Sequence, residues 1–105
     1  MPSLLQIDFP FSGPFGEELA EMLDDLARDI AAEPELSWKI WTETEDEEQA
    51  GGIYLFSDKR AAERYLDKHV QRLNSFGITD VRVRLFDVNQ ALTEMTGGPL
   101  ASQGE

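Results

Sequence analysis

LSWKIWTETEDEEQAGGIYLF, residues 36–56, is the segment that decides the fold. Two runs of alternating side chains, residues 36–45 and 51–56, flank an acidic stretch, which is the pattern of two strands joined by a turn. The acidic stretch, residues 43–48, has five acids in six residues. It lacks the alternating ligand spacing and the central Gly of a calcium loop, so it predicts a solvated turn between antiparallel strands.

A strand and a helix are expected before this hairpin. Residues 4–11 alternate between two faces over eight positions, as a strand does. The turn Ser-Gly-Pro at residues 12–14 suits a helix start, because Pro at the first helical position gives up no hydrogen bond. The helix is expected to run to about residue 32, with its apolar residues on one stripe at 3.6-residue spacing.

After the hairpin, a second helix, a strand and a short helical turn are expected. Ser57 or Asp58 can cap the second helix, and Gly77 can close it. Residues 81–88 alternate as a fourth strand, and Asn89 can cap the short turn that comes next.

The resulting order is βαββαβ, the ferredoxin-like split βαβ arrangement. We therefore expect an α+β fold, with a four-stranded antiparallel sheet and two helices on one of its faces. The length of 105 residues suits a single domain, which we place at residues 1–96. Residues 97–105, which contain Gly, Ser and Gln, are expected to form a mobile C-terminal tail.

The two faces of this sheet are predicted to differ. The more uniformly apolar face should lie under the helices, and it carries Leu5, Ile7, Phe9, Trp38, Ile40, Ile53, Leu55, Val81, Val83 and Leu85. The other face sets aromatic rings among charges, which indicates an association site rather than a solvated surface. We expect a homodimer that stacks this face on its twin through Trp41, Tyr54, Phe56, Arg82, Arg84 and Phe86. A solvated face whose rings are shielded by long side chains is the alternative.

Composition excludes several classes of function. The formal net charge of −12 argues against binding to nucleic acid or to an anionic membrane surface, because both need clustered basic residues. No apolar run approaches the roughly 18 residues of a membrane span. The chain has no cysteine, which removes disulfides, thiolate metal sites and cysteine nucleophiles. We expect a cytoplasmic protein.

His69 is the only histidine, so Ser/His triads and metal sites built from several histidines have little support in the sequence. It falls in the middle of the apolar stripe of the second helix and therefore points toward the sheet, on the side predicted to carry Trp38. A histidine there is either a general base or proton donor, or a core residue satisfied by one hydrogen bond. Tyr65 and Trp38 likewise suit either a core or a planar aromatic ligand.

Six segments of the chain, in the same order, resemble the YdhR-type monooxygenases over about residues 4–92. They are LLQ at 4–6, GPFG at 13–16, WKIWTE at 38–43, AGGIYLF at 50–56, YL at 65–66 with KH at 68–69, and FDVN at 86–89. The resemblance implies a dimeric α+β barrel and kinship with enzymes that oxidise small aromatic or polycyclic substrates with O₂. It implies no metal, flavin or other cofactor, because such a substrate supplies the electrons itself.

The resemblance also implies roles for individual residues in a pocket between helices and sheet. Trp38 would stack on the substrate, His69 would take or donate a proton, and Tyr65 would hydrogen-bond to an oxygen. Phe9 and Phe11 would form the walls, with Ile40 on the same predicted face. Haem-degrading relatives leave His69 open as an axial ligand. The alternative from another class is a non-catalytic or stress-response dimer that holds a small hydrophobic molecule.

Overall fold

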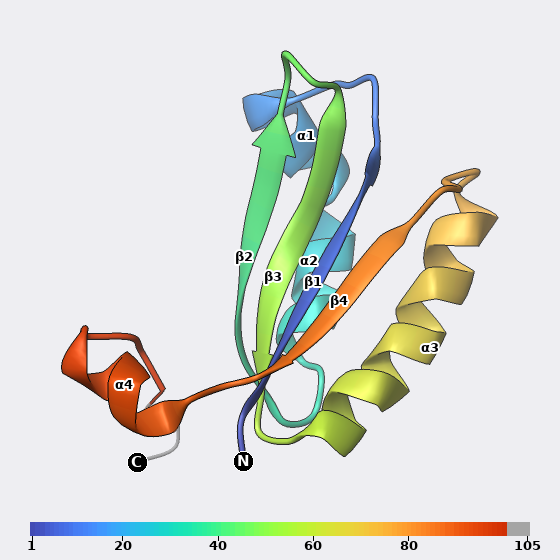
Figure 1. Ribbon diagram of the computed structural model, residues 1–105. Coiled ribbons are helices and arrows are strands. Elements are labelled where there is room, and N and C mark those ends of the chain that lie inside the picture. Colours follow the sequence, from blue (N-terminus) through green and yellow to red (C-terminus); the bar gives the residue numbers. More distant parts are fainter. Residues whose placement is uncertain (101–105) are drawn as a thin grey trace.

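A computed structural model describes residues 1–100, in which four strands form one antiparallel sheet (Figure 1). The strands lie in the order β2-β3-β1-β4, and they are β1 (Ser3–Pro10), β2 (Leu36–Thr44), β3 (Gln49–Phe56) and β4 (Arg82–Asp87). The helices are α1 (Gly16–Met22), α2 (Asp24–Ala31), α3 (Lys59–Ser75) and α4 (Gln90–Met95). The first three helices lie on one face of the sheet, whereas α4 projects from it after β4 (Figure 1).

The architecture is mixed α+β and consistent with a ferredoxin-like fold, but it has more helices than expected. The predicted first helix is divided into α1 and α2 at Leu23, whose ψ of 16° departs from helical geometry. Asp24 and Asp25 occupy the first turn of α2, where carboxylates interact favourably with the helix dipole. The structure therefore starts a new helix where the sequence predicted an uninterrupted one.

Side-chain caps begin the other two helices. Of the two candidates for α3, Asp58 is the cap: its Oδ1 accepts a hydrogen bond from the Ala61 backbone N–H at 2.8 Å. The predicted cap of α4 is also present, since Asn89 Oδ1 accepts from the Leu92 N–H at 3.1 Å. Each cap satisfies an N–H that has no partner within its own helix.

The strand register defines which side chains face the helices. Leu5 of β1 lies opposite Tyr54 on one side and Leu85 on the other. Directly opposed residues of an antiparallel pair share a face, so all three belong to the helix-covered face. The core on this face consists mainly of Leu5, Ile7, Phe9, Ile30, Tyr54, Phe56, Ala61, Ala62, Tyr65 and Leu73.

The predicted faces of β2 and β3 are wrong. Lys39 lies opposite Tyr54, which places the odd-numbered residues from Lys39 to Glu43 on the helix-covered face. Tyr54 and Phe56 are buried against the helices, at 1% and 0% exposure, and Trp41 shares their face, so none of these three rings lies on the sheet face without helices. Because the side-chain period of a strand is two residues, a parity error of one position inverts every assignment along it.

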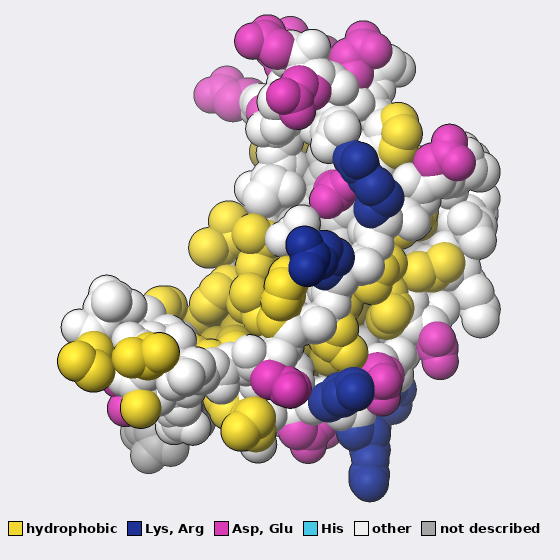
Figure 2. All heavy atoms as spheres, viewed as in Figure 1, with side chains coloured by type: hydrophobic (Ala, Val, Ile, Leu, Met, Phe, Trp, Pro, Cys, Tyr) yellow, Lys and Arg dark blue, Asp and Glu magenta, His cyan; other side chains and the backbone are white. Residues whose placement is uncertain are grey.

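The sheet face without helices, here called the open face, carries the residues that were predicted to be covered. Trp38 lies opposite Leu55, which in turn lies opposite Leu4, and Ile40 lies opposite Ile53. Figure 2 shows this face, with a hydrophobic patch across the sheet and charged side chains around it. Asp8, Arg82 and Arg84 are the charged residues of this face. They lie on it as predicted, and so does Phe86.

The chain after α4 returns to the open face. Trp38 Nε1 donates a hydrogen bond to the Pro99 carbonyl at 2.9 Å. The predicted tail thus makes a contact within its described part, and residues 101–105 lie outside the described residues. None of the helices in residues 1–100 is long and apolar enough to cross a membrane.

Candidate functional site

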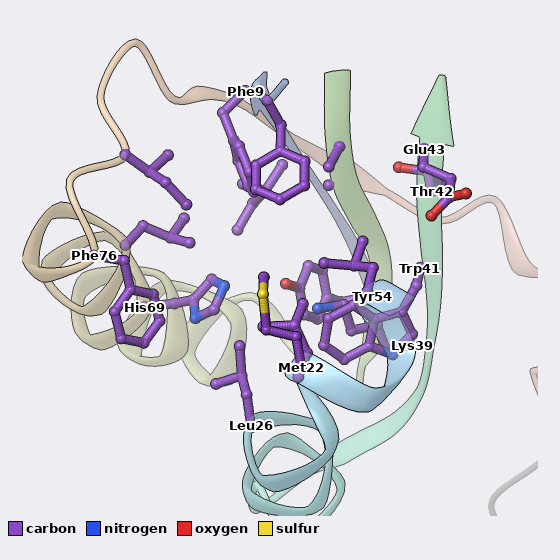
Figure 3. A pocket seen from close by; sticks show the side chains of 18 of the residues that line it. Phe9, Met22, Leu26, Lys39, Trp41, Thr42, Glu43, Tyr54, His69 and Phe76 are labelled. Atoms are coloured by element: carbon purple, nitrogen blue, oxygen red, sulfur yellow. The ribbon is translucent and has the colours of Figure 1, made fainter. Parts of the chain in front are cut away.

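A cavity of about 480 Å³ lies between the helix-covered face of the sheet and helices α1, α2 and α3 (Figure 3). Most of its walls are apolar, and aromatic rings from three elements contribute to them. The apolar wall consists of Ile7, Phe9, Phe11, Leu19, Met22, Leu23, Leu26, Trp41, Ala50, Leu73, Phe76 and Ile78. Met22, Trp41 and Phe76 are more than 40% exposed, so they form the entrance. This shape and lining suit a planar apolar ligand.

Polar groups reach the cavity from both sides. Asp25, Lys39, Thr42, Glu43, Tyr54 and His69 line it. The carboxylate of Glu43 accepts a hydrogen bond from the Gly16 backbone N–H at 3.0 Å. This contact ties the edge strand β2 to the first turn of α1.

His69 projects from α3 into the cavity (Figure 3). Its Nδ1 lies 3.0 Å from Arg72 Nη2, and Arg72 Nη1 is in turn paired with Asp29 at 2.6 Å. A guanidinium only donates hydrogen bonds, so Nδ1 must accept, and the neutral ring then carries its proton on Nε2.

The surroundings of His69 determine its protonation state and which of its ring nitrogens can contact a ligand. Burial, with the positive charges of Lys39, Arg72 and Lys68, lowers the pKa of His69 to about 3, so the ring is neutral at physiological pH. Within residues 1–100, no buried side-chain nitrogen or oxygen lacks a hydrogen-bond partner. Nε2 makes no such bond there, so it is in contact with the cavity, where its N–H can donate to a ligand oxygen.

The rings of two tyrosines, Tyr54 and Tyr65, pack against the His69 ring. The Tyr65 hydroxyl donates a hydrogen bond to the Tyr54 hydroxyl at 3.3 Å, and the Tyr65 ring stacks on His69 with centroids 5.0 Å apart. Burial raises the pKa of Tyr65 to about 12 and raises that of Tyr54 as well. Both therefore remain phenols at neutral pH, and they fix the orientation of the imidazole.

Lys39 approaches the cavity from the opposite wall. Its Nζ lies 3.3 Å from the centroid of the Trp41 ring and 4.6 Å from that of Tyr54. Burial, with a smaller contribution from the charge of Arg72, lowers the pKa of Lys39 to about 7. Near neutral pH this amine thus exists in both protonation states.

The predicted site residues divide between the two sides of the sheet. His69, Phe9 and Phe11 line the cavity. Tyr65 is fully buried behind His69 and is not part of the wall. Trp38 and Ile40 lie on the open face, so neither can contact a ligand in this cavity.

Sequence reasoning missed Lys39, Trp41 and Tyr54 as cavity residues. A lysine in a strand is usually assigned to the solvent-facing side of the sheet. Trp38 and Trp41 point to opposite faces of β2, so the presence of a tryptophan did not show which face the helices cover. Gly52, which lies opposite both Ile7 and Trp41, was the available signal. A glycine on a covered strand often marks the place where another group approaches closely.

No group of three or more His, Cys, Asp or Glu side chains within residues 1–100 is placed to hold a metal ion. The arrangement instead offers one weakly basic amine, one imidazole N–H donor and aromatic walls. These groups can move a proton and stabilise an anion on a flat substrate.

No curated protein matches this chain. A family model, described as "Putative mono-oxygenase ydhR", matches residues 4–99, which include β1 from its second residue, the other three strands, the four helices and every residue of the cavity. The chain therefore belongs to the ydhR mono-oxygenase family.

Proposed function

We propose that the cavity is the site of a cofactor-independent mono-oxygenase reaction on a small, planar aromatic or polycyclic substrate. The observation that carries this proposal is the position of His69 Nε2, which meets an otherwise largely apolar cavity of about 480 Å³. Membership of a family described as a mono-oxygenase supports the reaction class.

The chemistry suits a substrate whose anion is electron-rich enough to reduce O₂. An anthrone is an example: its ring methylene loses a proton, and the resulting anion transfers electrons to O₂ and forms a C–O bond. The hydroperoxide that results after protonation loses water to give the ketone. One O₂ is consumed, one of its oxygen atoms enters the product and the other leaves as water, so the substrate supplies both reducing electrons.

In this proposal His69 acts as a hydrogen-bond donor rather than as the base. Its proton on Nε2 faces the cavity, and Arg72 holds the other nitrogen. A donor placed against the developing oxyanion stabilises it more strongly in an apolar, water-poor site than in water. Tyr54 and Tyr65 keep the ring in place behind it.

We also propose that the protein is a homodimer, a dimeric α+β barrel, in which the open faces of two chains stack. The observation in favour is a contiguous apolar patch on that face, with Ile40 55% exposed and Trp38, Ile53 and Phe86 beside it. Arg84 on the same face is exposed, and it offers a cation to a carboxylate of a second copy. Exposed patches of this kind usually mark association sites.

Oxygen uptake with a panel of anthrones and dihydroxyaromatics tests the function. Removing one donor to an oxyanion typically costs about 10²–10³-fold in rate, so His69→Ala should lose that much. His69→Gln keeps an N–H near the position of Nε2 and should retain most of the activity, which a general base at this position would not allow.

Absence of turnover with every substrate, together with retained binding, would instead identify a non-catalytic binding protein. Adding haemin and recording the Soret band tests the third possibility, that the cavity binds haem. A Soret shift that depends on His69 would favour haem binding over the proposed reaction.

A further inference from the structure

Lys39 differs from Arg72, the other partly buried cation within residues 1–100, in having no acidic partner among those residues. Of the nine Lys and Arg residues, five form ion pairs with carboxylates in the part of the chain that the structure describes, namely Arg28, Arg64, Lys68, Arg72 and Arg82. Lys59, Arg60 and Arg84 are exposed. Lys39 is half-buried, and its Nζ makes no ion pair within residues 1–100 despite the 21 acidic residues of the sequence. A buried charge without a partner is costly, so its retention in a cavity wall calls for a function.

The sheet is shaped to bring this side chain into the cavity. Lys39 crosses the strand next to it at Gly52, where a Cβ atom would lie only 2.5 Å from Lys39 Cε. Because Gly52 has no side chain, the aliphatic part of the Lys39 side chain can pass over it. Its amine then lies between the rings of Trp41 and Tyr54, on the wall opposite His69 (Figure 3).

The charges around the amine leave both of its protonation states accessible. Burial disfavours the ammonium and lowers the pKa of Lys39 to about 7, with Arg72 on α3 adding to the effect. The face of Trp41 attracts the ammonium and acts in the opposite direction. The other ionisable groups that face the same cavity are Asp25 on α2, Glu43 on β2, Tyr54 on β3 and His69 on α3.

We propose that Lys39 is the catalytic base of this site and that the substrate is a neutral, planar aromatic with one acidic O–H or C–H bond. The free amine takes that proton, and the ammonium so formed remains beside the substrate anion, while His69 Nε2–H donates to the anion from the facing wall. One proton moves from carbon or oxygen to nitrogen, and the net charge of the complex does not change. The inference rests on the proposed function for the oxidation steps after the proton transfer, but not for the transfer itself.

The basicity of the amine can be measured without any substrate. Competitive labelling with trace acetic anhydride over a pH series, read by mass spectrometry, reports the neutral fraction of each lysine. Lys39 should become reactive near pH 7, well below the ordinary lysine value of about 10.4. A labelling midpoint of Lys39 at that ordinary value would overturn the proposal.

Proton transfer is tested with 4-nitrophenol, whose acid and anion differ in colour. One pH unit below the pKa of the free phenol, wild-type protein should bind it as the anion. Lys39→Met, which keeps the length of the stem and removes the amine, should bind the neutral phenol, and Lys59→Met should behave as wild type.

Equal anion formation in wild type and Lys39→Met would overturn the role of Lys39. If the nitrophenol result is as expected but no anthrone consumes O₂, the base assignment stands and the mono-oxygenase proposal fails. If anthrone is oxidised and Lys39→Met lowers kcat/KM by less than tenfold, the mono-oxygenase proposal stands and Lys39 is not the base, because general-base catalysis contributes about 10²–10⁴-fold.

Discussion

The Nδ1 atom of His69 lies 3.0 Å from Nη2 of Arg72, and this contact determines which edge of the imidazole meets the cavity. The guanidinium occupies the acceptor nitrogen and adds a positive charge beside it. Both effects keep the ring neutral with its proton on Nε2. The cavity therefore meets a fixed hydrogen-bond donor.

NMR titration of the single histidine tests this contact. Because the pKa of His69 is lowered to about 3, its ring signals in wild type should not titrate between pH 5 and 8. Arg72→Met removes a charge that contributes to the shift and should move the midpoint upward. A wild-type midpoint near 6.5 would mean that the ring is neither buried nor held as described.

Stability should depend on pH through Lys39. Between the folded pKa of about 7 and the ordinary value of 10.5, the unfolded chain binds more protons at this residue than the folded chain, so its contribution to stability rises with pH. Below pH 7 the full cost of burying the ammonium is present. Lys39→Met should therefore be more stable than wild type at pH 6, by a margin that shrinks toward pH 10. Urea denaturation at both values measures it, and a margin independent of pH would contradict the lowered pKa.

Gly52→Ala tests the path of the lysine stem. The added methyl group would collide with Lys39 Cε, which is part of a flexible side chain and can move. It would also lie 3.2 Å from the Ile40 carbonyl oxygen, a tight contact that a shift of a few tenths of an ångström relieves. We expect a folded protein in which the amine is displaced from the cavity, the nitrophenol anion no longer forms and the acetylation midpoint of Lys39 rises. Gly51 is not a suitable control, because a Cβ there would lie 2.0 Å from the Ile7 carbonyl oxygen and disrupt the sheet.

The two tryptophans should respond differently to substitution. Trp38 lies on the open face and loses one hydrogen bond to Pro99 when replaced by Phe, at a cost of about 1 kcal/mol or less. Its replacement should leave nitrophenol affinity within about twofold of wild type. Trp41→Leu removes a cavity wall and should weaken binding several-fold. Fluorescence-monitored titrations measure both affinities. Weaker binding by Trp38→Phe and unchanged binding by Trp41→Leu would mean that the ligand binds at the open face.

Association should be lost when the open face is charged. Wild type should elute with a light-scattering mass of about 24 kDa, twice the 11.8 kDa of the chain. Ile40→Asp should shift the mass toward the monomer, because it places a carboxylate in the apolar patch. Ala20→Asp, at an exposed position on α1, is the control and should leave the mass unchanged. A wild-type mass near 12 kDa at micromolar concentration would exclude the dimer.

The strands and the helices other than the division between α1 and α2 could be predicted from the sequence because their signals are local. Alternation located all four strands, and Asn89 was recognisable as a cap from its short acceptor side chain. Ser57 and Asp58 were both candidates for the cap of α3, and the structure selects Asp58. The apolar stripe of α3 indicated that His69 points toward the sheet, and the structure places it in the cavity wall.

The faces of β2 and β3 could not be predicted in the same way. Both faces carry large apolar residues, so counting them does not separate Trp38 from Trp41. The register with β1 decides between them, and it is a long-range relationship that pairs Leu5 with Tyr54. Lys39 was missed for the same reason, since its burial depends on a glycine of the neighbouring strand.

Oxygen consumption with 1,8-dihydroxyanthrone is the most direct test of the central claim that the cavity beneath α3 is a mono-oxygenase site. Wild type and Lys59→Met should consume one O₂ per anthrone, at the same rate, with the anthraquinone as product. Lys39→Met and His69→Ala should each be slower by about 100-fold or more while remaining folded. Turnover in both cavity variants at the wild-type rate would contradict the claim.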